Sequence, residues 1–320
     1  MRAAPFLVFS LLSSAAFGQT TSSPTCTAPR LVGTWERISL LRNALSVQPP
    51  DAPLFVKFGS DGHWSMMEMP ERPKIDKPLD QLTAKELFTR FDSVDGGYGT
   101  WTIKGDVVTR RHLVNIGAGG ENNSQDRSCL FENEILALIG VNSGRTPQAR
   151  FRRLTPQPPK SNALVGTWER TALTIDGKPA FADGGFGAAA PEPVASTLGK
   201  GGPAAPSAAQ IVILGEDGWF SQTQLPTGRK PAGKPLEQFA VDDYLKTYGG
   251  VAASRGTYTV ENNLFTRKHV DDIDPNLVGS EEGGQFSIEG DVMTLRGATR
   301  TGAKFDARYQ RLKPLSTAGQ

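Results

Sequence analysis

Leu31–Arg37 and Leu164–Arg170 have the same sequence, Leu-Val-Gly-Thr-Trp-Glu-Arg. A heptapeptide that includes tryptophan has little chance of recurring at random within one chain. The repeat therefore indicates a single module present in two copies. The chain of 320 residues is long enough for two domains of ordinary size.

The similarity between the copies continues well beyond the heptapeptide. The offset between matching residues grows from 133 at the heptapeptide to 157 at the Gly-Thr-aromatic motif, so copy two has gained about 24 residues. The segment 178–209 is rich in Gly, Ala and Pro and lacks hydrophobic periodicity, so we expect the insertion there, as a long flexible loop. Five further pairs of segments match: Asp61–Ser65 with Asp217–Ser221, Lys77–Leu82 with Lys234–Phe239, Gly99–Ile103 with Gly256–Val260, Thr109–His112 with Thr266–His269, and Ala149–Leu154 with Ala307–Leu312.

These matches define the expected domain organisation. Domain one spans 29–154 and domain two spans 163–314, with the proline-rich linker 155–162 between them. Residues 1–18 resemble a signal peptide, with Arg2 before an apolar run that is too short to span a membrane. We therefore expect a periplasmic or secreted protein with no stable membrane insertion.

Each copy is predicted to be mostly β-strand. Short apolar runs flank turn residues, as in Leu54–Phe58 and Trp64–Met69 around Asp61-Gly62, a pattern typical of antiparallel hairpins. One segment per copy has helical spacing instead: Leu82–Phe91, with Thr83 as a candidate N-cap, and Phe239–Tyr248. The predicted fold class is all-β: two tandem antiparallel barrels, each with a short helix at one end or outside.

The chain contains two cysteines, Cys26 and Cys129. In an exported protein such a pair is expected to form a disulfide, here between the mature N-terminus and a strand of domain one. The alternative is two buried free thiols.

The ordered set Gly-x-Trp, Asp-Gly, Gly-Thr-aromatic, His and a final Arg-Leu, present twice, resembles bacterial lipocalin-like domains of the calycin superfamily. The resemblance implies barrels of about eight to ten strands. It also implies that an arginine of the last strand packs across the tryptophan of the first. Here Trp35 would meet Arg150 or Arg153, and Trp168 would meet Arg308 or Arg311, by a cation–π contact with a structural role. Lipocalins are typically not tandem, so the second barrel could lack a ligand or serve as a surface for a partner.

Alternation along the strands selects candidate cavity residues. An ordinary core would use the same residue types, and this remains the alternative for each of them. His112 and His269 occupy matching places and could donate a hydrogen bond, act as a general base, or be structural. The candidate ligand-binding residues are Trp64, Met66, Trp101, His112, Phe220, Tyr258 and His269, with Phe55, Val114, Ile213 and Val270 as further wall positions.

Several kinds of site are not indicated. Gly185–Ala190 fits a loose dinucleotide pattern but does not lie between a strand and a helix, so no cofactor is predicted. Three histidines and an incomplete acidic motif at Asp271–Asp274, expected to be a solvated turn, predict no metal site. The net charge of +2, without a basic stripe, argues against nucleic-acid binding.

Three functions remain open. The first is an exported protein that binds a small, mostly apolar molecule in a barrel cavity. The second is a barrel enzyme of the isomerase or cyclase type that uses His112 or His269. The third is a cell-envelope interaction module with the 178–209 loop as its contact arm.

Overall fold

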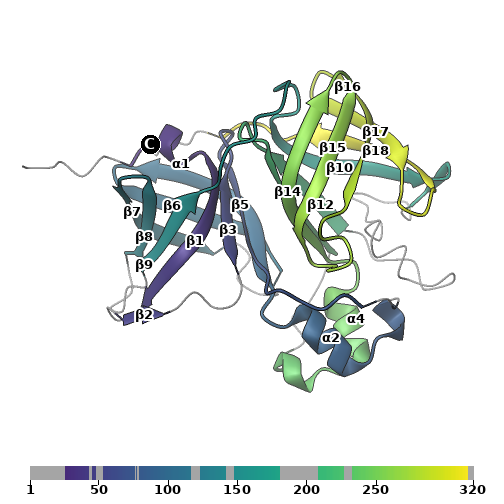
Figure 1. Cartoon of the computed structure of the whole chain (residues 1–320), viewed down its shortest axis with the longest axis horizontal. Helices are drawn as coiled ribbons and strands as arrows, with labels where there is room; N and C mark the ends of the chain where they lie inside the picture. The colour runs from purple at the N-terminus through teal and green to yellow at the C-terminus, as the bar shows by residue number, and fades with distance from the viewer. Residues whose placement is uncertain are drawn as a thin grey trace, which may run out of the picture.

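The structure is a computed structural model, and Figure 1 shows two barrels side by side. The expected signal peptide and most of the 178–209 segment lie outside the described residues. Only the ends of that segment are described, and both are strands. The described residues are 26–42, 45–47, 53–75, 77, 79–116, 123–141, 148–180, 208–226 and 233–315.

Barrel 1 is a meander of eight antiparallel strands that closes where the first strand pairs with the last. The additional strand β2 (Leu45–Val47) pairs only with the end of β1, outside the closed ring. The helix α1 (Ala28–Leu31) precedes the barrel. The closed strands are β1 (Gly33–Arg42), β3 (Leu54–Phe58), β4 (His63–Glu68), β5 (Asp95–Lys104), β6 (Val107–Asn115), β7 (Ser124–Glu132), β8 (Ile135–Gly140) and β9 (Gln148–Arg153).

Barrel 2 repeats this topology, and β11 (Lys178–Pro179) takes the place of β2. The prediction of two antiparallel all-β barrels is therefore confirmed. The closed strands are β10 (Gly166–Ile175), β12 (Ala208–Leu214), β13 (Trp219–Pro226), β14 (Ala252–Glu261), β15 (Leu264–Asp272), β16 (Glu281–Glu289), β17 (Val292–Ala298) and β18 (Lys304–Arg311).

The repeated heptapeptide builds the closed end of each barrel. The Trp35 indole donates to the carbonyl of Leu31, 2.7 Å away, and the Arg153 guanidinium lies 4.2 Å above its ring. Gly33 has a φ of +131°, and a Cβ there would collide with Arg153. Glycine is thus required for the arginine to reach the ring. Trp168, Gly166 and Arg311 repeat this arrangement, with the guanidinium at 4.1 Å.

The two barrels pack against each other reciprocally. Thr34 donates to Asp217 of barrel 2 at 2.7 Å, and the equivalent Thr167 faces Asp61 of barrel 1. The segment that follows each barrel also bonds the Asp-Gly turn of the other one, through the amides of Gln157 and Leu315. Such two-way contacts are typical of an isologous dimer interface, here within one chain.

Strands at this interface are buried on both faces, so a buried residue there does not necessarily face the barrel interior. Every residue of β3 and β13 is buried. Phe55 lies beneath Arg255 of barrel 2, and Ile213 packs on Tyr98 of barrel 1. The prediction that Phe55 and Ile213 face a cavity is therefore wrong. Their apolar side chains serve the contact between barrels.

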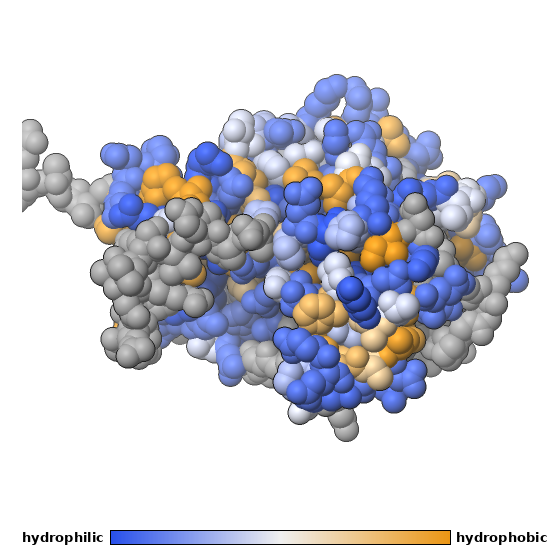
Figure 2. Space-filling model, turned by 60° about the horizontal axis from the view of Figure 1, so that its bottom comes forward, coloured by the Kyte–Doolittle hydropathy of each residue, from blue (hydrophilic) through white to orange (hydrophobic). Residues whose placement is uncertain are grey.

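The two predicted helices are present and pack on each other outside the barrels (Figure 1). They are α2 (Ala84–Phe91) and α4 (Val241–Tyr248). The Phe91 and Tyr248 rings stack with their centroids 4.4 Å apart, in an apolar cluster drawn from both copies. On this side of the molecule, Figure 2 shows hydrophobic residues in small groups among hydrophilic ones.

Replacing Thr83 with alanine should destabilise the protein by about 1 kcal/mol. Thr83 forms a capping box with Glu86, whose carboxylate accepts from the Thr83 amide at 2.8 Å. Denaturant unfolding measures the change, with Thr89→Ala as the matched control, because Thr89 lies within the helix and bonds only the carbonyl of Lys85. Equal stability of Thr83→Ala and wild type would contradict the capping role.

Two features relate to the expected export. Cys26 and Cys129 form a disulfide that joins the segment before α1 to β7. Within the described part of the chain, no helix has the length and apolar character needed to cross a membrane.

Candidate functional site

The half of each barrel away from the tryptophan plug contains inward-facing polar side chains. They surround one aromatic residue in each barrel, Trp64 of β4 in barrel 1 and Phe220 of β13 in barrel 2. In barrel 1 the histidine ring centroid lies 4.7 Å from that aromatic ring and an arginine lies 4.9 Å above it; in barrel 2 the values are 5.6 and 5.8 Å. We name these groups the Trp64 cluster (Trp64, Arg110, His112, Gln125, Arg127) and the Phe220 cluster (Phe220, Arg267, His269, Asp272, Glu282).

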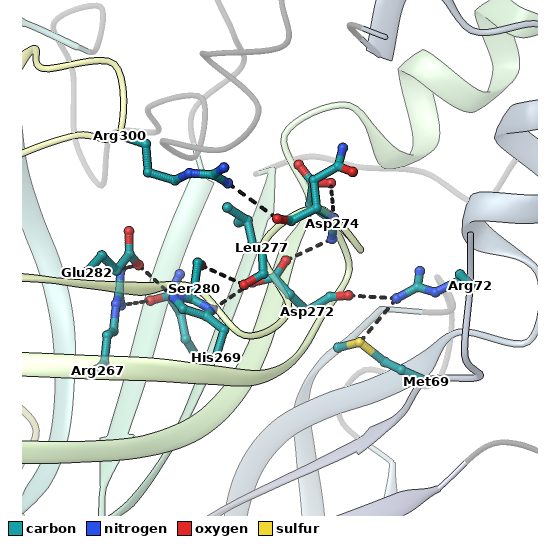
Figure 3. Close-up of polar contacts among 12 residues, drawn as sticks. Met69, Arg72, Arg267, His269, Asp272, Asp274, Leu277, Ser280, Glu282 and Arg300 are labelled. Atoms are coloured by element: carbon teal, nitrogen blue, oxygen red, sulfur yellow. Dashed lines mark hydrogen bonds and ion pairs between the residues drawn. The ribbon is translucent and has the colours of Figure 1, made fainter. Parts of the chain in front are cut away.

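In the Phe220 cluster, His269 lies between two carboxylates (Figure 3). Its Nδ1 is 2.9 Å from Asp272 and its Nε2 is 2.9 Å from Glu282. Burial alone would lower the pKa of His269, but the hydrogen bonds to the two carboxylates outweigh burial and raise it. The two carboxylates therefore favour the charged form of the imidazole.

Glu282 also forms an ion pair with Arg267. Burial would raise the pKa of the Glu282 carboxyl, but the charge of Arg267 and the hydrogen bond to His269 lower it well below its ordinary range. Glu282 thus places a carboxylate beside both Arg267 and His269, and both ring nitrogens of His269 are engaged. A histidine in this state has no lone pair free to act as a general base. Among the described residues, no group of His, Cys, Asp and Glu is arranged to hold a metal ion.

The cluster is joined to barrel 1 through Arg72 (Figure 3). Arg72 donates to the backbone carbonyls of Asp272 and Ile273 in barrel 2, at 2.7 and 3.2 Å, and to that of Arg90 at 2.6 Å. The Asp272 side chain also accepts from the amide of Asp274 at 2.8 Å. Asp272 and Asp274 are 4 and 3% exposed, so the prediction that Asp271–Asp274 is a solvated turn is wrong. The turn is buried because it forms part of the contact between the barrels.

The Trp64 cluster has the same frame but a different charge balance. Arg110 and Arg127 both donate to the Gln125 side-chain oxygen, at 3.1 and 3.2 Å. Burial, followed by the charge of Arg127, lowers the pKa of Arg110 to about 10, so its guanidinium remains charged near neutral pH. In the described part of the chain, neither Arg110 nor His112 has a carboxylate partner.

His112 consequently differs from its counterpart in barrel 2. Burial first, and then the charges of Arg110 and Arg127, lower the pKa of His112. Gln125 lies beside the ring, but neither ring nitrogen has a regular hydrogen bond to a described residue. His112 is therefore the neutral member of the pair, and its side chain is 4% exposed to solvent.

Gln125 of barrel 1 corresponds to Glu282 of barrel 2, and a second inward pair has the acid in barrel 1 and the amide in barrel 2. In barrel 1, Arg37 binds Glu68 through both carboxylate oxygens, with a shortest distance of 2.7 Å. In barrel 2, the equivalent Arg170 donates to Gln224 at 2.8 Å. Each barrel thus has one inward carboxylate where the other has an amide, which indicates that the two interiors have diverged in charge.

The interior of barrel 2 around His269 is nearly filled by side chains of that barrel. A cavity of about 30 Å³ remains among residues that include Arg170, Gln222, Arg267, His269 and Glu282. This volume has room for water molecules but is far below that of a typical ligand pocket. The lining is also more polar than the predicted apolar wall.

The predicted ligand-binding residues fall into two groups. Trp64, His112, Phe220 and His269 belong to the clusters, and Met66 packs partly buried against the core of barrel 1. Trp101 and Tyr258 lie deeper, where their polar atoms donate to the carbonyls of Gly59 and Gly215, at 3.2 and 2.7 Å. Six residues of the two clusters were not predicted from the sequence: Arg110, Gln125, Arg127, Arg267, Asp272 and Glu282. The sequence could have predicted Arg110, because it lies two residues from His112 on the same strand and therefore shares its face.

The comparisons with known proteins leave the family open. No family model matches the chain, and no curated protein is similar enough to match. One solved structure that matches is a protein of unknown function from the DUF3598 family of Nostoc punctiforme. The match covers 89% of this chain and 97% of that one at 9% sequence identity, with a TM-score of 0.20. A similarity this low carries no argument about function.

Proposed function

We propose that the chain is an exported binding protein that holds a small molecule in the open half of a barrel. One observation carries the proposal: charged and amide side chains face inward where an ordinary core would be apolar. Arg110, for example, is 7% exposed, and an unpaired buried charge is unfavourable unless something compensates it. A bound polar ligand would provide that compensation.

The resemblance to lipocalin-like domains supports this function. In both copies an arginine of the last strand covers the tryptophan of the first, as that resemblance implies. An eight-stranded barrel that is plugged at one end leaves the other end as the entrance for a small ligand. We therefore propose a tandem lipocalin-like protein in which the plugged halves are structural.

Export is supported by the disulfide between Cys26 and Cys129, because disulfides form and persist in oxidising compartments. The apolar run of the first 18 residues points the same way. We propose a periplasmic or secreted location.

The chemistry of the clusters changes the expected ligand. The sequence predicts a mostly apolar molecule, whereas the inward groups of the Trp64 cluster include two arginines and an amide. We therefore propose a ligand with a small apolar body and a polar group. The enzyme alternative gains no support in barrel 2, where both ring nitrogens of His269 are engaged.

Isothermal titration of the mature chain tests the function with three probes of one shape: benzoate, benzylamine and benzyl alcohol. Saturable binding of any of them within barrel 1, located by shifts of the Trp64 and His112 signals in NMR spectra, would support it. If none of the three binds saturably, the proposed binding function of this cluster is wrong.

A further inference from the structure

We propose that the Trp64 cluster is a carboxylate-binding site, and that Glu282 fills the equivalent site of barrel 2 from within the chain. This inference rests on the proposed binding function and names the chemical class of its ligand. The two copies place corresponding side chains around two different charge distributions.

The positions correspond residue by residue. Arg110 pairs with Gln125 across β6 and β7, and Arg267 pairs with Glu282 across β15 and β16 in the same register. Inward-facing rings at Trp64 and Phe220 support the arginine of each copy. The carboxylate of Glu282 therefore occupies, relative to this frame, the place that the amide of Gln125 takes in barrel 1.

Glu282 shows what an anion does in this frame. It accepts from His269 at 2.9 Å and forms an ion pair with Arg267, so one carboxylate joins both cationic groups. With Gln125 in its place, the neutral amide oxygen receives Arg110 and Arg127 but balances neither charge. A carboxylate is the group that a planar guanidinium binds best, through two parallel hydrogen bonds.

Barrel 1 also has a cation that barrel 2 lacks. Arg127 places a second guanidinium beside Gln125 in barrel 1. The equivalent residue of barrel 2 is Gly284, which has no side chain to do so. Among the described residues, the acid whose charge acts on Arg127 is Asp126, and its side chain accepts from Thr109 at 2.7 Å. The inward-facing Glu68 is already bound through both carboxylate oxygens by Arg37.

The neighbours of the cluster suit a carboxylate with a small apolar body. Met66 of barrel 1 is equivalent to Gln222 of barrel 2, whose side-chain oxygen accepts a hydrogen bond from Arg267. The wall beside Trp64 is therefore less polar than the wall beside Phe220. The plugged half below is filled by core side chains, which limits the length of the ligand. Benzoate fits this description and serves as the probe.

Isothermal titration with benzoate, using the whole mature chain, tests the assignment. Wild type should bind benzoate more tightly than it binds benzyl alcohol or benzylamine. Gln125→Glu builds the anion of barrel 2 into barrel 1 and should weaken benzoate binding about ten- to a hundredfold. Ser124→Glu is the matched control, because it adds the same charge one residue away at an exposed position, and it should leave binding within about twofold.

A second measurement uses wild type alone, so the test does not depend on a variant that folds. Benzoate should raise the pKa of His112 in NMR titrations, since a carboxylate beside an imidazole favours its charged form. Equal binding of benzoate by wild type and Gln125→Glu, or binding of benzyl alcohol as tight as that of benzoate, would overturn the carboxylate assignment while leaving small-molecule binding intact. Failure of all three probes would instead contradict the proposed function itself.

Discussion

Replacing Asp217 with asparagine should lower the free energy of unfolding by about 3–5 kcal/mol. Its carboxylate lies 2.8 Å from the ammonium of Lys57 on the other barrel, and the two side chains are 12 and 3% exposed. Asparagine keeps the size of the side chain but leaves the buried lysine without its opposite charge. Urea unfolding of both proteins at neutral pH measures the difference.

Asp61→Asn is the matched control for this prediction. Asp61 has the reciprocal place in barrel 1, but the residue equivalent to Lys57 is Ile213, so no buried lysine depends on it. We expect a clearly smaller loss of stability from Asp61→Asn. Equal losses in the two variants would show that the Lys57–Asp217 pair has no special role in holding the barrels together.

Asp217 also gives the interface a pH dependence of definite sign. Burial raises the pKa of its carboxyl, but the charge of Lys57 and the hydrogen bonds from Lys57 and Thr34 outweigh burial and lower it. A carboxyl with a lowered folded pKa stabilises the protein fully above its ordinary pKa. That contribution is lost as the pH falls through the lowered value.

Removing the disulfide should have an effect of similar size. Cys26 and Cys129 are 103 residues apart, and in the chain-entropy model closing such a loop stabilises the folded state by up to about 4–5 kcal/mol. The double variant Cys26→Ser/Cys129→Ser removes the cross-link without leaving a free thiol. Its denaturant midpoint should fall accordingly, and treatment of wild type with a reductant should give the same midpoint.

The loss is expected to begin in barrel 1, where the disulfide joins the segment before α1 to β7. Hydrogen exchange of the double variant should accelerate in β7 more than in β16, the equivalent strand of barrel 2. Wild-type stability in the double variant, or equal acceleration in both strands, would show that the cross-link does not stabilise barrel 1 in this way.

The repeat made the fold predictable. The heptapeptide set the register of the two copies, and the turn residues between apolar runs marked the hairpins, so two antiparallel barrels followed from local patterns. Packing of one barrel on the other was not visible in the same patterns. An alternating strand tells which residues share a face, but it does not tell that both faces are buried, as in β3.

The same limit applied to the candidate site. His112 and His269 were identified because they match, whereas the informative residues are those that differ: Gln125 against Glu282, and Arg127 against Gly284. A difference between the copies can be interpreted only when each side chain is known to lie beside the histidine of its own barrel. The structure supplies that knowledge through the pairing of β6 with β7 and of β15 with β16.

The same arrangement of side chains lowers the pKa of the histidine in barrel 1 and raises that of the histidine in barrel 2. NMR titration of the imidazole signals, assigned with His112→Gln and His269→Gln, measures both in the same sample. We expect His269 to titrate above the ordinary histidine pKa and His112 below it, because carboxylates lie beside the first and arginines beside the second. Coincident titrations, or His112 titrating above His269, would contradict it.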